Sequence, residues 1–346
     1  MGFEKEGFEV AYVNEIHAPF LEAYKHSRHK LKIPQPIYGY HSSDVTELLS
    51  DRSDTLTKLL KSARKTKRII GFVGGPPCPD FSVGGKNKGK DGDNGKLSKT
   101  YVQLICEQKP DFFVFENVKG LYRTAKHREF FDSLKNDLAE AGYLCTERLI
   151  NAIEYGVAQD RERIILFGTR ITDAKKIIKE FDWHVATKYP NRKAFEFNWP
   201  DRGESSWKPE KHPDTPTELT IQHWFAKNDV TAHPNAQHHF QPRAGLKKFQ
   251  TIQEGDDSKK SYKRLHRWRY SPTAAYGNNE VHLHPVLARR ISIAEALAIQ
   301  SLPKEFELPE SMTLTNMFKT VGNGVPFLAA KGIAAAIKKF LMKAKK

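Results

Sequence analysis

Short apolar runs alternate with amphipathic stretches along the first half of the chain. The apolar runs have the length and the β-branched or aromatic content of strands, and the stretches between them carry apolar residues at helical spacing. The expected strands are Glu9–Val13, Arg68–Val73, Phe112–Glu116 and Arg163–Phe167. The expected helices are Ala18–His29, Val45–Arg64 and His127–Ala141, the last of which meets Gly142, a favourable helix stop. This order predicts an α/β fold in which helices cover a parallel sheet.

The pattern changes between about Thr187 and Pro285, where Trp, His, Pro and Arg become frequent and the apolar periodicity fades. We therefore expect a second, smaller and loop-rich domain at residues 187–285. Helical patterning returns at Ser292–Leu302 and Val325–Met342. If the last helix packs on the first sheet, the chain leaves its first domain, residues 1–186, and re-enters it over residues 286–346.

Composition narrows the class of protein. The 346 residues, 39% of them hydrophobic, can form one or two domains, and the net charge of +15 favours a polyanionic partner such as nucleic acid. A merely basic soluble protein has the same charge, so this alternative stays open. The three cysteines have no metal-type spacing and cannot make a disulfide framework. Because no apolar run approaches the length of about 20 residues that spans a bilayer, we expect a cytoplasmic protein without a membrane partner.

The strongest motif is Gly74-Gly75-Pro76-Pro77-Cys78-Pro79-Asp80-Phe81-Ser82, directly after an expected strand. Ligands of open α/β sheets bind outside the carboxyl ends of the strands, so Cys78 would face a binding crevice. The two prolines before it stiffen the turn and hold a nucleophile in place. The alternative for this motif alone is a buried, inert cysteine. The Gly- and Lys-rich segment that follows, Gly84–Lys99, is expected to be a mobile loop.

Two further motifs carry charge near the expected sheet. Phe115-Glu116-Asn117-Val118 places a carboxylate at the end of an apolar strand, where its pKa can be raised for acid duty. In Gln159-Asp160-Arg161-Glu162-Arg163, the two arginines alternate and would hold an anion or a carboxylate on one face. In isolation, the first motif also fits a capping residue and the second a solvated edge strand.

The order and spacing of these three motifs resemble those of the DNA (cytosine-5)-methyltransferases of bacterial restriction-modification systems. Arg290–Pro303 (RISIAEALAIQSLP) and Val321–Pro326 (VGNGVP) match further blocks of the family, in the same order. The resemblance covers residues 1 to about 170 and about 285 to the end. It implies a Rossmann-like S-adenosylmethionine-dependent methyltransferase fold with a second, smaller target-recognition domain.

The resemblance implies a role for each matched residue of the reaction site. Cys78 would attack C6 of a cytosine that has flipped out of double-stranded DNA. Glu116 would hydrogen-bond the base, and Arg161 and Arg163 would support the pocket. Contacts to DNA are expected from Ser82, Gln159 and Thr273. The methylation would protect host DNA from a cognate restriction endonuclease.

The resemblance also implies a set of cofactor contacts. The expected contacts to S-adenosyl-L-methionine are Glu15, Ile16, Asp44, Val45, Pro77, Leu97, Asn323 and Val325. The family pattern begins with a strand and a Phe-x-Gly-x-Gly-Gly loop, and Met1 falls just after that loop. We therefore expect the chain as written to bind the cofactor more weakly than a longer form, or to need a second subunit that supplies the segment.

Two alternative functions remain open on the sequence. An RNA cytosine methyltransferase would use the same chemistry, although the residues around Cys78 and the sizeable second domain favour duplex DNA. A catalytically silent DNA-binding protein is the alternative from another class. The retained Cys78, Glu116 and Arg161 favour an enzyme, whereas the unmatched cofactor loop favours a silent protein.

Overall fold

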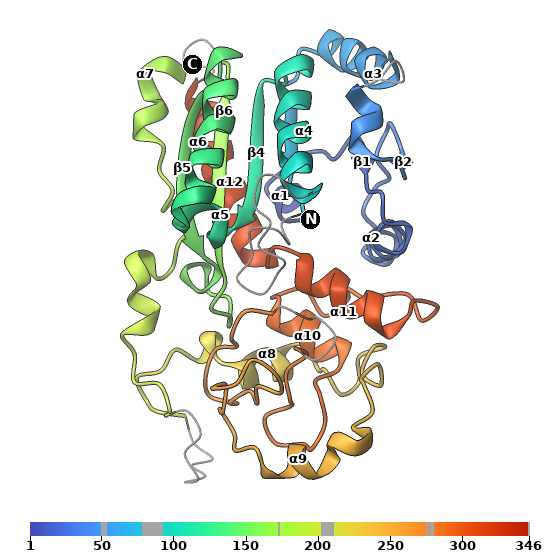
Figure 1. Ribbon diagram of the computed structural model, residues 1–346, viewed down its shortest axis with the longest axis vertical. Helices are drawn as coiled ribbons and strands as arrows, with labels where there is room; N and C mark the ends of the chain where they lie inside the picture. The colour runs from blue at the N-terminus through green and yellow to red at the C-terminus, as the bar shows by residue number, and fades with distance from the viewer. Residues whose placement is uncertain are drawn as a thin grey trace.

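A computed structural model describes residues 1–49, 54–77, 93–171, 174–201, 211–274, 276 and 280–344 (Figure 1). The strands are β1 (Val13–Asn14), β2 (Tyr40–His41), β3 (Gly71–Gly74), β4 (Phe112–Val118), β5 (Leu144–Asn151) and β6 (Glu162–Thr169). The α-helices are α1 (Gly2–Lys5), α2 (Ala18–Lys30), α3 (Asp54–Lys65), α4 (Asp93–Gln108), α5 (Lys119–Arg123), α6 (Ala125–Glu140), α7 (Ala174–Ile177), α8 (Ile221–Lys227), α9 (Leu246–Thr251), α10 (Ile293–Ile299), α11 (Leu314–Asn323) and α12 (Phe327–Ala344). Short 3-10 helices are η1 (Val45–Leu49), η4 (Ala152–Tyr155), η5 (Ile178–Glu180), η6 (Pro190–Phe195), η7 (Thr217–Leu219) and η8 (Arg243–Gly245).

The main sheet has the order β3-β4-β6-β5. Strand β3 runs parallel to β4, as expected, whereas β6 runs antiparallel to both β4 and β5. The expectation of a wholly parallel sheet was therefore wrong for β6, which runs antiparallel to both of its neighbours. Strand β5 was not expected at all, because its sequence Leu144–Asn151 mixes charged and apolar residues as an edge strand does.

Helices cover both faces of this sheet, and β4 supplies apolar side chains to each face in turn. Phe112 and Val114 pack with α12, in a core that also contains Ile333. Phe113 and Phe115 point to the other face and pack with α4 and α6. Burial on both faces explains why β4 reads as a continuous apolar run. The expected return of the last helix to the first sheet is confirmed, since α12 lies against the sheet (Figure 1).

Strands β1 and β2 form a separate, two-stranded parallel sheet beside α2. The expected strand Glu9–Val13 was misplaced, because pairing begins only at Val13. The expected helix Val45–Arg64 was also wrong. Its described residues form η1 and α3 as two separate elements, because the apolar spacing that suggested one helix runs across both of them.

The described residues between 211 and 324 gather around one core, and we call them the lower part after their position in Figure 1. Helices α8, α10 and α11 contribute Ile221, Leu297 and Phe318 to this core. The described residues of 187–285 form isolated bridges and short helices, so the loop-rich prediction is confirmed. Helices α10 and α11 belong to the same core, whereas α12 belongs to the sheet.

Two details of the helices complete the description. The prediction of a mobile loop at Gly84–Lys99 was wrong for Asp93–Lys99, because these residues form the start of helix α4. The preceding residues of that segment lie outside the described ranges. The expected stop at Gly142 is confirmed, because this glycine follows α6 with φ +89°. Among the described residues, no helix has both the length and the apolar character that a membrane crossing demands.

Candidate active site

The Gly-Pro turn after β3 and the carboxylate at the end of β4 lie close together. A Cβ atom on Gly75 would lie 2.7 Å from Oε2 of Glu116, so only a glycine leaves room for this carboxylate. The amide of Asn117 donates to the carbonyl of Pro76 over 3.4 Å. The parallel pairing of β3 with β4 brings these two motifs to one edge of the sheet. Cys78 and Ser82, the predicted nucleophile and a predicted DNA contact, lie outside the described residues.

Glu116 is held by an arginine from the neighbouring antiparallel strand. Arg163 Nε lies 3.0 Å from Oε1 of Glu116, and the two side chains are 14% and 19% exposed. Burial raises the pKa of Glu116 above its usual range, although the charges of Arg163 and Arg161 act in the opposite direction. The carboxyl group is therefore easier to protonate than an exposed glutamate, while it remains accessible to a ligand.

Arg161 connects the site to the lower part. Its guanidinium is buried and donates to the carbonyls of Ala274 over 3.0 Å and Gly322 over 2.8 Å. Burial and the nearby Arg163 lower the pKa of Arg161 to about 9, against the opposing charge of Glu116. Among the described residues, Arg161 Nε has no hydrogen-bond partner. The expected grouping of Arg161, Arg163 and Glu116 is present, and it includes the Val-Gly-Asn-Gly motif.

Gln159 and Gln300 join three of the sequence motifs. Gln300 donates to the carbonyl of Val321 over 2.7 Å and accepts from the amide of Gln159 over 3.5 Å. The side-chain oxygen of Gln159 accepts from the backbone of Ala274. Gln159 is fully buried, so in this structure the predicted DNA contact positions neighbouring backbone. Gln300 was missed; it is the polar residue that directly follows the apolar stretch Ala296–Ile299 at the end of α10, and this contrast was the available signal.

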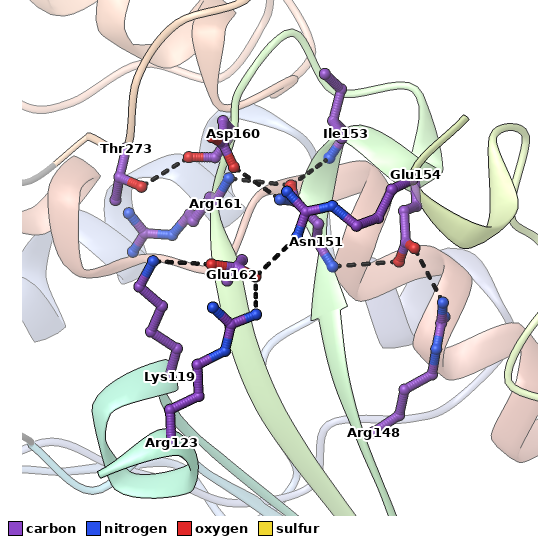
Figure 2. Close-up of polar contacts among 11 residues, drawn as sticks. Lys119, Arg123, Arg148, Asn151, Ile153, Glu154, Asp160, Arg161, Glu162 and Thr273 are labelled. Atoms are coloured by element: carbon purple, nitrogen blue, oxygen red, sulfur yellow. Dashed lines mark hydrogen bonds and ion pairs between the residues drawn. The ribbon is translucent and has the colours of Figure 1, made fainter. Parts of the chain in front are cut away.

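Thr273 is exposed and lies beside Asp160 (Figure 2). Its hydroxyl donates to the carbonyl of Asp160 over 2.6 Å. Asn151, at the end of β5, donates to the Asp160 carboxylate over 2.7 Å and accepts from the backbone N–H of Arg161. Asn151 therefore fixes the turn into β6, and through this turn the direction of Arg161.

Four of the expected cofactor contacts lie together on the β1–β2 unit. Glu15 and Ile16 follow β1, and Asp44 and Val45 follow β2, at the carboxyl ends of two parallel strands. Hydrogen bonds between Asn14 and Ser43 join the two strand ends. Ile16 is 60% exposed beside the carboxylate of Glu15, which accepts from the backbone of His17.

The other expected cofactor contacts come from different elements. Leu97 lies on α4, a helix that packs against η1, which begins at Val45. Asn323 is exposed at the end of α11, and Val325 packs beside the core under α12. Pro77 is exposed at the last described position before Cys78. Among the described residues, no cluster of side chains could hold a metal ion.

Comparisons with known proteins bear on the family and the fold of this chain. The Type II methyltransferase M.NmeDI of Neisseria meningitidis serogroup C is 63% identical over 342 residues, which cover 99% of this chain and 81% of that protein. M.FnuDI of Fusobacterium nucleatum is 28% identical, with 99% and 91% covered. A solved structure from E. coli, a prophage-encoded protein described as a DNA modification methyltransferase, has the same fold, with a TM-score of 0.64, 21% identity and 99% and 95% coverage. The family model of the C-5 cytosine-specific DNA methylases matches residues 1–339, and this chain belongs to that family.

Proposed function

We propose that this C-5 cytosine-specific DNA methyltransferase acts on double-stranded DNA, with Cys78 as nucleophile and S-adenosyl-L-methionine as methyl donor. The observation that carries the proposal is the closeness of Gly75 to Glu116, because it brings the turn that leads to Cys78 near a carboxyl group of raised pKa. A nucleophile and an acid on one sheet edge are what addition to a cytosine ring requires.

The chain's own residues would carry the steps on the base as follows. The thiolate of Cys78 adds to C6 of a flipped cytosine, and C5 becomes electron-rich. Glu116, in its protonated form, donates to N3 of the base, and its other oxygen accepts from the amino group. Arg163 keeps this carboxyl group in place from β6. Loss of the C5 proton to water, after methylation, lets the thiolate leave.

The residues of the β1–β2 unit fit the cofactor that this chemistry needs. The exposed side chain of Ile16 offers an uncovered apolar surface to an adenine ring, and the carboxylate of Glu15 beside it can accept hydrogen bonds from ribose hydroxyls. Leu97, Asp44, Val45, Pro77, Asn323 and Val325 would complete the contacts. When bound, S-adenosylmethionine supplies a methyl group activated by its sulfonium charge.

We assign target recognition to residues 187–285, with Thr273 and Ser82 as contacts to DNA beside the base and the buried Gln159 supporting the backbone there. The loop-rich architecture and the net charge of +15 support contacts to DNA bases and phosphates. Exchanging this segment for that of a relative with another target should move methylation to the relative's sequence; unchanged specificity would contradict the assignment. We further propose that the enzyme works in the cytoplasm, where it protects DNA from a cognate restriction endonuclease.

A covalent trap tests the central assignment. Duplex DNA with 5-fluorocytosine at the target should form a stable adduct with the wild-type chain, because fluorine at C5 blocks the elimination that releases the enzyme. We expect the adduct to vanish in Cys78→Ser and to persist in Cys106→Ser, which changes a thiol in α4. The reverse pattern, read as a mass shift on denaturing gels, would overturn the role of Cys78.

A further inference from the structure

Three cations meet at one carboxylate next to the active site. Glu162 pairs with Lys119 over 2.8 Å, with Arg123 over 3.0 Å and with Arg192 over 3.3 Å. Lys119 and Arg123 come from α5, as Figure 2 shows, and Arg192 comes from η6. We call Lys119, Arg123 and Arg192 the basic triad. No part of the chemistry described above uses it.

The basic triad presents positive charge outward. Its side chains are 48%, 54% and 56% exposed, whereas Glu162 beneath them is only 10% exposed. Burial alone would raise the pKa of Glu162, but the hydrogen bond from Lys119 and the surrounding cations lower it, so the carboxylate stays ionised. Three cations on one carboxylate leave an excess of positive charge. The lysine and the two guanidinium groups also keep donors for a second acceptor.

The backbone that carries Arg192 is unusual. Asn191 (φ 54°, ψ 37°) and Arg192 (φ 65°, ψ 14°) are consecutive non-glycine residues in the left-handed region. Such conformations are costly and persist where the surroundings impose them, often at ligand contacts. The guanidinium of Arg192 also lies 4.8 Å from the ring centre of Phe195. The backbone conformation and the ring contact together place the Arg192 guanidinium beside Glu162.

The location of the basic triad indicates its partner. Lys119 directly follows β4, which carries Glu116, and Glu162 directly precedes Arg163. Arg192 lies on the segment that leads toward the lower part, which contacts this edge through Thr273 and Asp160. The basic triad thus lies at the same end of β4 and β6 as Glu116 and Arg163, toward the lower part. Because side chains alternate along β6, it lies on the α5 face of the sheet, opposite the face of Glu116 and Arg163.

We propose that Lys119, Arg123 and Arg192 bind phosphates of the DNA backbone beside the target cytosine. This inference rests on the proposed function, since it assumes a DNA substrate at the Glu116 site. Phosphates are the ligands that arginine forks and lysine ammonium groups recognise best on a duplex. The contacts would position the duplex without reading its sequence.

The test is the salt dependence of DNA binding, measured by fluorescence anisotropy with a labelled target duplex and with an unrelated duplex. Each phosphate contact contributes about 0.9 to the slope of log affinity against log salt concentration. We expect two changes in the triple variant Lys119→Ala, Arg123→Ala, Arg192→Ala, equal for both duplexes. The slope should fall in magnitude by about 2 to 3, and the affinity should fall at least about tenfold. The matched control, Lys338→Ala, Lys339→Ala, Lys343→Ala, removes three exposed charges from α12 and should keep the wild-type slope.

Further variants separate the possible outcomes. Arg123→Lys with Arg192→Lys keeps every charge and should keep most of the slope. If the triple variant does not fold, the single changes Lys119→Ala and Arg123→Ala should each lower the slope by about 1. A wild-type slope in the triple variant, or an equal loss in the α12 control, would overturn the proposal. If the wild-type chain binds neither duplex, the proposed function fails instead.

Discussion

The sheet and the lower part of the molecule satisfy their buried backbone groups in different ways. In the sheet, strands pair with one another, and apolar side chains such as Phe113, Phe115 and Phe167 fill the layers at 0% exposure. In the lower part, buried polar side chains take the place of strands. Arg264, 4% exposed, donates to the carbonyls of Ile252, His284, Leu287 and Phe249.

The difference determines how each part responds to mutation. A sheet keeps its backbone hydrogen bonds when most of its side chains change, because the strands supply them. The lower part depends on particular side chains for the same bonds. Asn235, for example, both donates to and accepts from the backbone of Leu308. One substitution there can leave several buried carbonyls without a donor.

The largest expected effect is that of Arg264→Ala. The change removes the buried side chain that donates to four backbone carbonyls, and we expect the lower part to lose about 3 kcal/mol of unfolding free energy. Hydrogen exchange should show lost protection in residues 211–324 and unchanged protection in β4 and α6. Lys227→Ala is the control in the same part: its exposed ammonium lies 4.5 Å from the Trp224 ring centre, and its loss should cost less than about 1 kcal/mol. Equal losses of protection in both parts would contradict the comparison.

A second effect depends on pH. Burial, together with the charge of Lys263, lowers the pKa of His282 to about 3, and burial lowers that of His284 to about 4. In the unfolded chain these groups titrate near pH 6.5. Their contribution to stability is therefore complete above about pH 6.5 and is lost as the pH falls toward the folded-state values. Protonation of His282 in the unfolded chain should by itself lower the unfolding free energy of the lower part by about 2 kcal/mol between pH 7 and pH 5.

The sheet should not lose stability over the same pH range. Asp132 and Glu162, in and beside the sheet, are carboxyl groups whose pKa is lowered in the folded protein. Their contributions to stability are lost only below about pH 4.5. Denaturation followed by hydrogen exchange at pH 7 and pH 5 measures both parts. His282→Gln should flatten the pH dependence of the lower part; a pH dependence that survives this change would assign the effect to other groups.

The smallest expected change in stability is that of Gly75→Ala, just after β3, which we compare with Gly168→Ala inside β6. In Gly75→Ala the new methyl group meets the flexible end of Glu116, so the melting temperature should move by less than about 2 °C while activity falls at least about tenfold. In Gly168→Ala the methyl group would lie 2.2 Å from the buried ring of Phe113, and overpacking should cost about 1–3 kcal/mol. The two variants are compared by their melting temperatures and by the turnover rate of the folded protein in each. Similar profiles for the two variants would show that the sheet edge and interior do not differ.

The same contrast explains which elements the sequence predicts. β4 is apolar on both faces and α12 has a long apolar pattern, so local periodicity is enough to identify them. β5 has a polar, half-buried edge sequence, and its partner β6 lies beyond a turn fixed by Asn151. Helix α11 was missed because it contains Gly322, a residue that normally weakens a helix.

The residues of the candidate site could be predicted from the sequence for a different reason. Motifs such as Pro-Pro-Cys and Glu-Asn-Val name residue types whose order resembles a family, and this order does not depend on long-range packing. The contacts between motifs do depend on it. Gln300 bonds with Gln159, 141 residues away, and Arg161 with Gly322, 161 residues away. No local pattern contains such pairs, and the same holds for the meeting of Arg192 with Glu162.

The covering of one sheet face by α12 has a consequence for synthesis on the ribosome. The aromatic and aliphatic residues of that face, Phe112, Ile165 and Phe167, emerge more than 150 residues before the helix that shields them, which begins at Phe327. Until α12 emerges, the nascent chain carries an apolar surface that earlier segments such as Phe8 and Phe181 cover only in part, the kind that chaperones bind and that promotes aggregation. Translation rate and chaperone supply should therefore govern the yield of folded enzyme more strongly than its final stability does.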